Sequence, residues 1–146
     1  MKAISVVLLA LIGCTPWVGT VPIYQRGQAE CGVATVAMAT GIPYQDVRGW
    51  FLTNGAHFDY RFSNPGVMTG NVVRFLRSHG YEAEYVEDVD LVQRRPSIVT
   101  AEYDNTVYHS LFWDGWHLID PLLPWQQPRM TYVIVGQIFY RPTGNR

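Results

Sequence analysis

The chain has 146 residues, of which 48% are hydrophobic and only 16% charged, so it can bury the core of one ordinary domain and is not expected to be disordered. Its formal net charge of −1 excludes the basic stripe with which proteins capture nucleic-acid phosphates. Two cysteines cannot build a disulfide-rich scaffold, and no CxxC pair or HExxH motif indicates zinc. We therefore expect one compact domain without a metal or cofactor.

The N-terminus is typical of a secretory signal. Lys2 precedes an apolar run from Ala3 to Gly13, which would span about 16 Å as a helix and could not cross a bilayer core of about 30 Å. The run ends in LIGC, which resembles the lipobox of bacterial lipoproteins. This resemblance implies cleavage before Cys14 and attachment of lipid to Cys14.

These features divide the chain into a signal over 1–13, a tether over 14–24 and a single domain over 25–146. The expected location is the cell envelope, with the domain anchored to a membrane by lipid. The alternative is a cytoplasmic or virion protein that retains its apolar N-terminal segment. If Cys14 carries lipid, Cys31 has no disulfide partner within the chain.

Hydrophobic periodicity predicts three helices first, over 32–39, over 44–51 and from Thr69 to Gly80. The segment 32–39 is apolar or small at nearly every position, which is typical of a buried helix. Gly41 and Gly80 are expected to end the first and third helices. We expect the hydroxyl of Thr69 to cap the third helix.

After Gly80 the period changes to two, which predicts strands over 81–85, 96–103, 107–113, 116–120 and 132–140, the last bent at Gly136. The acidic group Glu87, Asp88 and Asp90 indicates a solvated loop rather than a cation site. Helices followed by antiparallel strands predict the α+β class rather than alternating βαβ units.

Asp114-Gly115, between two tryptophans, predicts a two-residue hairpin turn. In that register His109 lies directly opposite Asp120, with Cβ atoms about 4.5–5.5 Å apart, whereas a slip of one residue would place them on opposite faces. The carboxylate could then hold the imidazole in one tautomer and stabilise its protonated form. The alternative is a surface pair that contributes less than about 1 kcal/mol.

Cys31 lies where the extended lead-in becomes the first helix. Free backbone N–H groups and the helix dipole favour a thiolate there, and a neighbouring imidazolium would lower the pKa of the thiol further. The alternative is a small buried hydrophobic residue. A single cysteine followed downstream by a histidine is the pattern of a nucleophile and its base.

The segment QRGQAECGVATVAMATG resembles the start of the bacterial double-glycine-type cysteine peptidases, the bacteriocin-processing-like members of the papain-like clan. Their signature has a glutamine six positions before the nucleophilic cysteine, an acidic residue directly before it and a glycine after it. The matching positions are Gln25, Glu30, Cys31 and Gly32.

The segment YHSLFWDGWHLIDP resembles the histidine strand of the same family and the Asp-Pro that follows it. His109, Asp120 and Pro121 match these positions. The resemblance extends over about Gln25 to Tyr140, almost the whole domain.

The resemblance implies a papain-like fold, in which a buried N-terminal helix carrying the cysteine packs on an antiparallel sheet carrying the histidine and aspartate. It implies a cysteine peptidase or amidase that acts on a peptide or protein. Cys31 would form a thioester, His109 would act as base and then acid, Asp120 would orient His109, and Gln25 would donate to the oxyanion beside the Cys31 N–H. Gln28 is a competing oxyanion donor, but its position does not match the family.

Two other functions remain open. One is a non-enzymatic papain-like module that binds a peptide or a virion or envelope partner. The other is an acyl-transfer or deamidating enzyme that uses the same triad. The presence of Gln25, Cys31, His109 and Asp120 together favours an enzyme, because a binding module does not need a thiol beside an imidazole.

Overall fold

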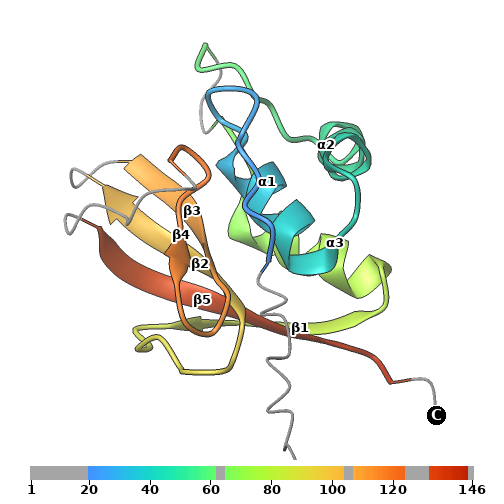
Figure 1. The fold of residues 1–146 in the computed structure, drawn as a ribbon. Helices are drawn as coiled ribbons and strands as arrows, with labels where there is room; N and C mark the ends of the chain where they lie inside the picture. Colours follow the sequence, from blue (N-terminus) through green and yellow to red (C-terminus); the bar gives the residue numbers. More distant parts are fainter. Residues whose placement is uncertain (1–19, 62–64, 104–106, 124–131, 145–146) are drawn as a thin grey trace, which may run out of the picture.

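The computed structural model describes residues 20–61, 65–103, 107–123 and 132–144. These residues form the helices α1 (Cys31–Thr40), α2 (Tyr44–Thr53) and α3 (Thr69–Ser78), and the strands β1 (Tyr81–Glu87), β2 (Ser97–Tyr103), β3 (Val107–Trp113), β4 (Leu118–Ile119) and β5 (Val133–Pro142). All strand pairs in the five-stranded sheet are antiparallel, so the mixed α+β class is confirmed (Figure 1).

The expected signal over 1–13 and Cys14 lie outside the described residues. The described part of the chain contains no helix that is both long and apolar enough to span a bilayer.

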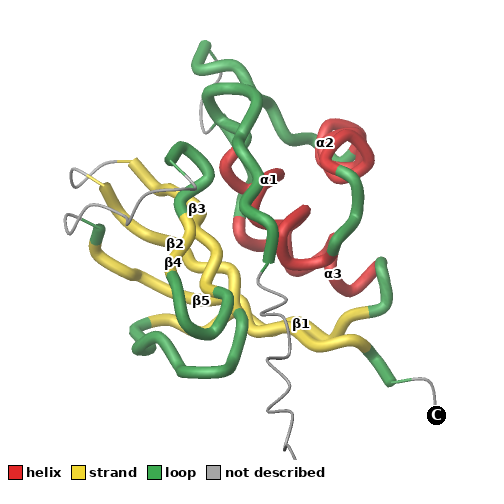
Figure 2. The backbone as a smooth tube through the Cα atoms, in the orientation of Figure 1, coloured by secondary structure: helices red, strands yellow, loops and turns green. Residues whose placement is uncertain are grey.

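The sheet has the order β1-β5-β2-β3-β4, with β1 at one edge as its alternating pattern predicts. The helices lie on one side of this sheet, where α1 packs on β3 and β2, α3 packs on β1, and α2 packs on α1 (Figures 1 and 2). The core between the two layers includes the fully buried side chains of Val33, Phe51, Phe75, Ile98 and Ile138.

The helix α1 is buried from Gly32 to Met38 and ends at Gly41, which has a φ of 72°. Gly32 is required by a close approach of another part of the chain. A Cβ atom at Gly32 would lie 2.8 Å from the Cβ of Val67, closer than real Cβ atoms come. The glycine after Cys31 therefore allows the segment around Val67 to pass directly over the start of α1.

The end of α3 is as expected, because Gly80 adopts a φ of 81° just after the helix. The prediction that Thr69 caps the start of this helix was wrong. Thr69 is the first helical residue, and Met68, still extended, occupies the capping position without a side-chain bond. The Met68 carbonyl instead accepts hydrogen bonds from the N–H groups of Asn71 and Val72.

The prediction of a two-residue hairpin turn was also wrong. Phe112 pairs with Ile119, so β4 is short and the connection is four residues long, from Asp114 to His117. Asp114 shapes this longer connection because its Oδ1 accepts the N–H groups of Trp116 and His117, both at 2.7 Å. The true register differs from the predicted one by two residues, and an even shift keeps every side chain on its predicted face.

The bend expected at Gly136 is confirmed as a bulge in β5. Thr100 of β2 pairs with Gly136 and the next residue pairs with Ile134, so Val135 is the extra residue. The hydroxyl of Tyr85 lies directly over Gly136, where it would collide with any Cβ atom. The bulge and the missing side chain thus let Tyr85 lie across β5 on the helix-covered face of the sheet.

Candidate active site

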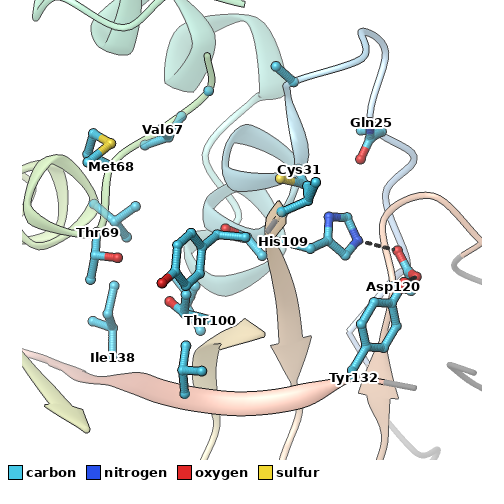
Figure 3. A pocket seen from close by; sticks show the side chains of 18 of the residues that line it. Gln25, Cys31, Val67, Met68, Thr69, Thr100, His109, Asp120, Tyr132 and Ile138 are labelled. Atoms are coloured by element: carbon cyan, nitrogen blue, oxygen red, sulfur yellow. Dashed lines mark hydrogen bonds and ion pairs between the residues drawn. The ribbon is translucent and has the colours of Figure 1, made fainter. Parts of the chain in front are cut away.

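A cavity of about 1060 Å³ lies between the start of α1, the segment 65–69 and the sheet. Cys31, His109 and Asp120 are on one wall, and Val67, Met68 and Thr69 face them (Figure 3). The imidazole of His109 lies between the other two members of the expected triad (Figure 3). The structure therefore brings Cys31, His109 and Asp120, three of the predicted site residues, to one cavity.

Cys31 is the first residue of α1 and is partly exposed. Burial of its sulfur raises the pKa of the thiol, but the hydrogen bond and positive charge of His109, with further hydrogen bonds from Ser110, lower that pKa below its ordinary value. The helix also leaves its first N–H groups without intrahelical acceptors, so an anion at this place is stabilised. Compared with an ordinary cysteine, the equilibrium of Cys31 is therefore shifted toward the thiolate.

Ser110 is a site residue that the sequence interpretation missed. The strand β4 pairs only with Phe112 and Trp113, so it leaves the edge of β3 at Ser110 open to the start of α1. Both the backbone and the side chain of Ser110 hydrogen-bond to Cys31. The predicted register placed Ser110 opposite Ile119, and no sequence signal could assign it to Cys31.

The predicted pair of His109 and Asp120 is confirmed. His109 is only 9% exposed, and its Nε2 lies 2.8 Å from Oδ1 of Asp120. Burial lowers the pKa of the imidazole, but the hydrogen bonds and charges of Asp120 and Cys31 outweigh burial and raise it to about 9. His109 is thus an imidazolium at neutral pH, with Nε2 on Asp120 and Nδ1 left for Cys31.

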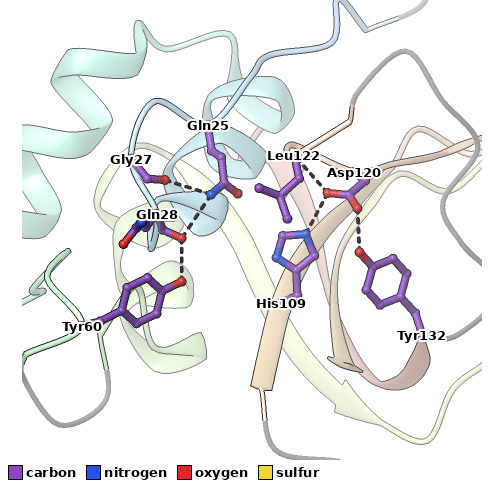
Figure 4. A network of polar contacts seen from close by, with 8 residues as sticks. All are labelled: Gln25, Gly27, Gln28, Tyr60, His109, Asp120, Leu122 and Tyr132. Carbon is purple, nitrogen blue, oxygen red and sulfur yellow. Dashed lines mark hydrogen bonds and ion pairs between the residues drawn. The ribbon is translucent and has the colours of Figure 1, made fainter. Parts of the chain in front are cut away.

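Asp120 is held by three donors. Its Oδ1 accepts the N–H of Leu122 at 2.8 Å in addition to His109, and its Oδ2 accepts the hydroxyl of Tyr132 at 2.7 Å (Figure 4). Burial raises the pKa of this carboxyl group, but the hydrogen bonds from His109, Tyr132 and Leu122 lower it overall. Asp120 is therefore a fixed carboxylate aimed at the imidazole.

Tyr132 is the second site residue that sequence reasoning missed. Its ring stacks on His109 with 5.7 Å between the centroids and 28° between the planes, while its hydroxyl donates to Asp120. It therefore contacts both members of the pair from one side. Tyr132 was assigned only to the last strand, because no short-range spacing links it to either residue.

Gln25 lies beside the site, but its amide is turned away from the expected role. Its Nε2 donates to the carbonyl oxygens of Gly27 at 2.8 Å and Gln28 at 3.2 Å, and its backbone N–H donates to Pro121 at 3.0 Å. Its Oε1 is buried without a hydrogen-bond partner among the described residues and points toward the side of His109 (Figure 4). Donation to an oxyanion thus requires the amide to rotate.

The structure gives Gln28 a backbone role rather than a side-chain one. Its carbonyl oxygen accepts the hydroxyl of Tyr60 at 2.8 Å as well as the amide of Gln25 (Figure 4). These bonds shape the loop that precedes α1 and place Gln25 over the cavity.

Glu30, the acidic residue before the cysteine, anchors the same loop from the other side. It is 4% exposed, its Oε2 accepts the hydroxyl of Tyr44 at 2.7 Å, and its Oε1 accepts Nε of Arg48 at 2.6 Å. The N–H of Arg26 donates to the same tyrosine oxygen at 2.9 Å. These bonds tie the lead-in to α2.

No family model and no curated protein matches the chain. Within the described ranges, no three His, Cys, Asp or Glu side chains form a group that could hold a metal ion. The described residues thus bring a thiol, an imidazole and a carboxylate together, a set that can attack a carbonyl group.

Proposed function

We propose that the chain is a papain-like cysteine peptidase or amidase that cleaves its substrate through a thioester on Cys31. The observation that carries this proposal is the contact between Cys31 and an imidazole whose other nitrogen is held by Asp120 at 2.8 Å. A cysteine that only fills space in the core does not require a charged partner, whereas a nucleophile does.

In the first step Sγ of Cys31 attacks the substrate carbonyl carbon, and the electron pair of the C=O bond moves to oxygen. The free N–H groups at the start of α1 donate to this oxyanion, and the Gln25 amide adds a donor once it has rotated. As the C–N bond breaks, Nδ1 of His109 gives its proton to the leaving nitrogen. A thioester and a neutral imidazole remain.

In the second step a water molecule attacks the thioester, and Nδ1 of His109 takes a proton from that water. The C–S bond breaks, which releases the carboxylic acid and restores the thiolate and the imidazolium. Throughout, Asp120 keeps the ring oriented, and Tyr132 packs against its face.

The arrangement of the elements supports the papain-like part of the proposal. Cys31 begins a helix, His109 lies on a strand against which that helix packs, and Asp120 directly follows the next strand. This is the order that the resemblance of the two sequence segments to the double-glycine-type peptidases implies.

The test is to incubate the full chain with a mixture of short peptides of varied sequence and to identify cleavage products by mass spectrometry. Wild type is expected to cleave a subset of them, and Cys31→Ser and His109→Ala to cleave none. Hydroxylamine should divert product to hydroxamate by intercepting the thioester.

The matched control is His117→Ala, which removes a histidine in the connection after the same strand, outside the residues that line the cavity. This variant should cleave like wild type. Cleavage that persists in Cys31→Ser, or no cleavage of any peptide by wild type, would overturn the proposal.

The lipoprotein prediction rests on Cys14 and is tested separately. We propose that the mature chain begins at Cys14 and carries acyl groups there. The intact mass of protein purified from a bacterial host should correspond to residues 14–146 plus acyl mass, and an intact Met1 would contradict the prediction.

A further inference from the structure

Acidic side chains outnumber basic ones in the lining of the cleft. Its acidic lining residues are Glu87, Asp88 and Asp120, and His109 is the basic one. No arginine lines the cleft, although arginines occur in three of the four described ranges of the chain. A cleft with carboxylates and few cations attracts positive charge, because its walls exclude water and concentrate the field.

The two further carboxylates stand at a fixed place relative to the reactive pair. Glu87 pairs with Gly136, Gly136 pairs with Thr100, and Thr100 pairs with Ser110, so the four residues form one row across β1, β5, β2 and β3. Residues in such a row point to the same face, here the face covered by the helices. Three strand spacings separate Glu87 from Ser110, which is about 14 Å.

Neither Glu87 nor Asp88 has an ion-pair partner among the described residues, in contrast to Asp120 with its three donors. Their position is nevertheless fixed. The N–H of Asp88 donates to the carbonyl of the bulge residue Val135, and Asp88 has a φ of 50°. The turn thus presents two unpaired carboxylates to the cleft beside the hydroxyl of Tyr85, whose pKa is raised by burial and by these two charges.

A second and independent feature also indicates a donor-bearing ligand. Gln25 places in the same cleft a buried carbonyl oxygen that has no hydrogen-bond partner in the described part of the chain. A buried acceptor of this kind is costly unless a ligand supplies a hydrogen bond. The lining of the cleft also includes large exposed hydrophobic side chains, Met68 at 58% and Tyr108 at 68% exposed. The cleft therefore offers acceptors and apolar surface to an extended chain.

We propose that the cleft selects peptides that carry a lysine or arginine side chain, bound by the carboxylates of Glu87 and Asp88. This rests on the proposed peptidase or amidase function and adds its substrate class. A span of about 14 Å equals about four extended residues. Because a long cationic side chain covers part of this distance, the basic residue lies about two or three residues from the cleaved bond.

The test uses paired thiol-reactive peptides, which need no turnover. One pair is iodoacetyl-Gly-Gly-Lys amide and its twin with acetyl-lysine, and a second pair carries a chloromethyl ketone at the other end of the peptide, so that both directions along the cleft are sampled. The rate of labelling is followed at Cys31 by peptide mass spectrometry, because Cys14 is a second thiol.

In at least one direction, the lysine probe should label wild type about tenfold faster than its neutral twin, the effect expected of a charge-assisted hydrogen bond in a cleft. The double variant Glu87→Gln, Asp88→Asn should bring this ratio close to one. The control Glu84→Gln removes one carboxylate from an exposed position of β1 outside the cleft and should leave the ratio unchanged. In wild type the ratio should fall with added salt, a readout that does not depend on folding of the double variant.

Equal labelling by both twins in both directions, with a thiol that still reacts at pH 6, would overturn this inference alone. A ratio that persists in a folded double variant would do the same. Labelling of Cys31 that follows the ionisation of an ordinary thiol would instead overturn the proposed function and, with it, this inference.

Discussion

Two buried carboxylates flank Cys31, and their surroundings differ in one respect. Glu30 accepts a tyrosine hydroxyl at 2.7 Å and an arginine nitrogen at 2.6 Å, whereas Asp120 accepts a tyrosine hydroxyl at 2.7 Å and a histidine nitrogen at 2.8 Å. A guanidinium keeps its proton across the working range of proteins, and an imidazole does not.

The difference separates a structural anchor from a reactive group. The network of Glu30 holds the lead-in loop against α2. The network of Asp120 includes an imidazole whose other nitrogen, Nδ1, is directed at Cys31 and, in the proposed mechanism, gives its proton to the leaving group. Variants on the two sides should therefore affect different properties, stability on one side and proton transfer on the other.

The largest expected effect is that of His109→Ala on the reactivity of Cys31 at pH 6. Without the imidazolium the thiol returns toward an ordinary pKa of about 8.5, so its alkylation by a haloacetamide should slow on the order of a hundredfold. The rate is measured against pH in wild type and variant. Equal rates at pH 6 would show that His109 does not ionise Cys31.

The variant Glu30→Gln should affect folding rather than chemistry. It breaks a buried ion pair whose arginine is partly exposed, so the free energy of unfolding in denaturant should fall by about 2 kcal/mol. The pH profile of Cys31 alkylation in the folded variant should match that of wild type. A shifted profile would remove the distinction between the two carboxylates.

Asp120→Asn should move the alkaline limit of cleavage. The charge of Asp120 helps to raise the pKa of His109 to about 9, and the imidazolium, with its proton, is lost as the pH rises through that value. Removing the charge lowers this pKa, so the decline should begin about one pH unit lower, and cleavage at about pH 10, above both pKa values, should fall about tenfold. NMR titration of the His109 ring checks the shift without turnover, and an unchanged midpoint would contradict it.

The smallest expected effect compares two tyrosine variants. Tyr132→Phe removes the donor to Oδ2 of Asp120 but keeps the ring, so the carboxylate is held less firmly and cleavage should fall about threefold. Tyr44→Phe removes the corresponding donor from Glu30 and should leave cleavage unchanged. Equal effects of the two variants on cleavage would show that Tyr132 is not a positioning residue.

The sequence predicted the α+β class and the contact between His109 and Asp120, because both depend on short-range patterns. Periodicity and glycine positions locate the helices, and α3 ends beside Gly80 as expected. The pair of His109 and Asp120 was predicted from the wrong turn, yet it forms, because a register error of two residues does not change the face of a strand.

The parts that the sequence did not predict depend on contacts between distant segments. Ser110 reaches Cys31 only because β4 is short, and Tyr132 reaches His109 from the start of the last strand. Glu87 and Asp88 are exposed as expected, but Glu87 ends β1 rather than lying in a loop, and the pairing of β1 with β5 places both residues in the cleft. No local pattern carries this information.

The most direct test of the account is to titrate the ultraviolet absorbance of the Cys31 thiolate, taken as the difference between wild type and Cys31→Ser, with and without His109→Ala. We expect the thiolate to be present at neutral pH and to persist well below about 8.5 in wild type, and to appear only near that value when His109 is replaced. A midpoint of about 8.5 in both proteins would contradict the ion pair and, with it, the proposed chemistry.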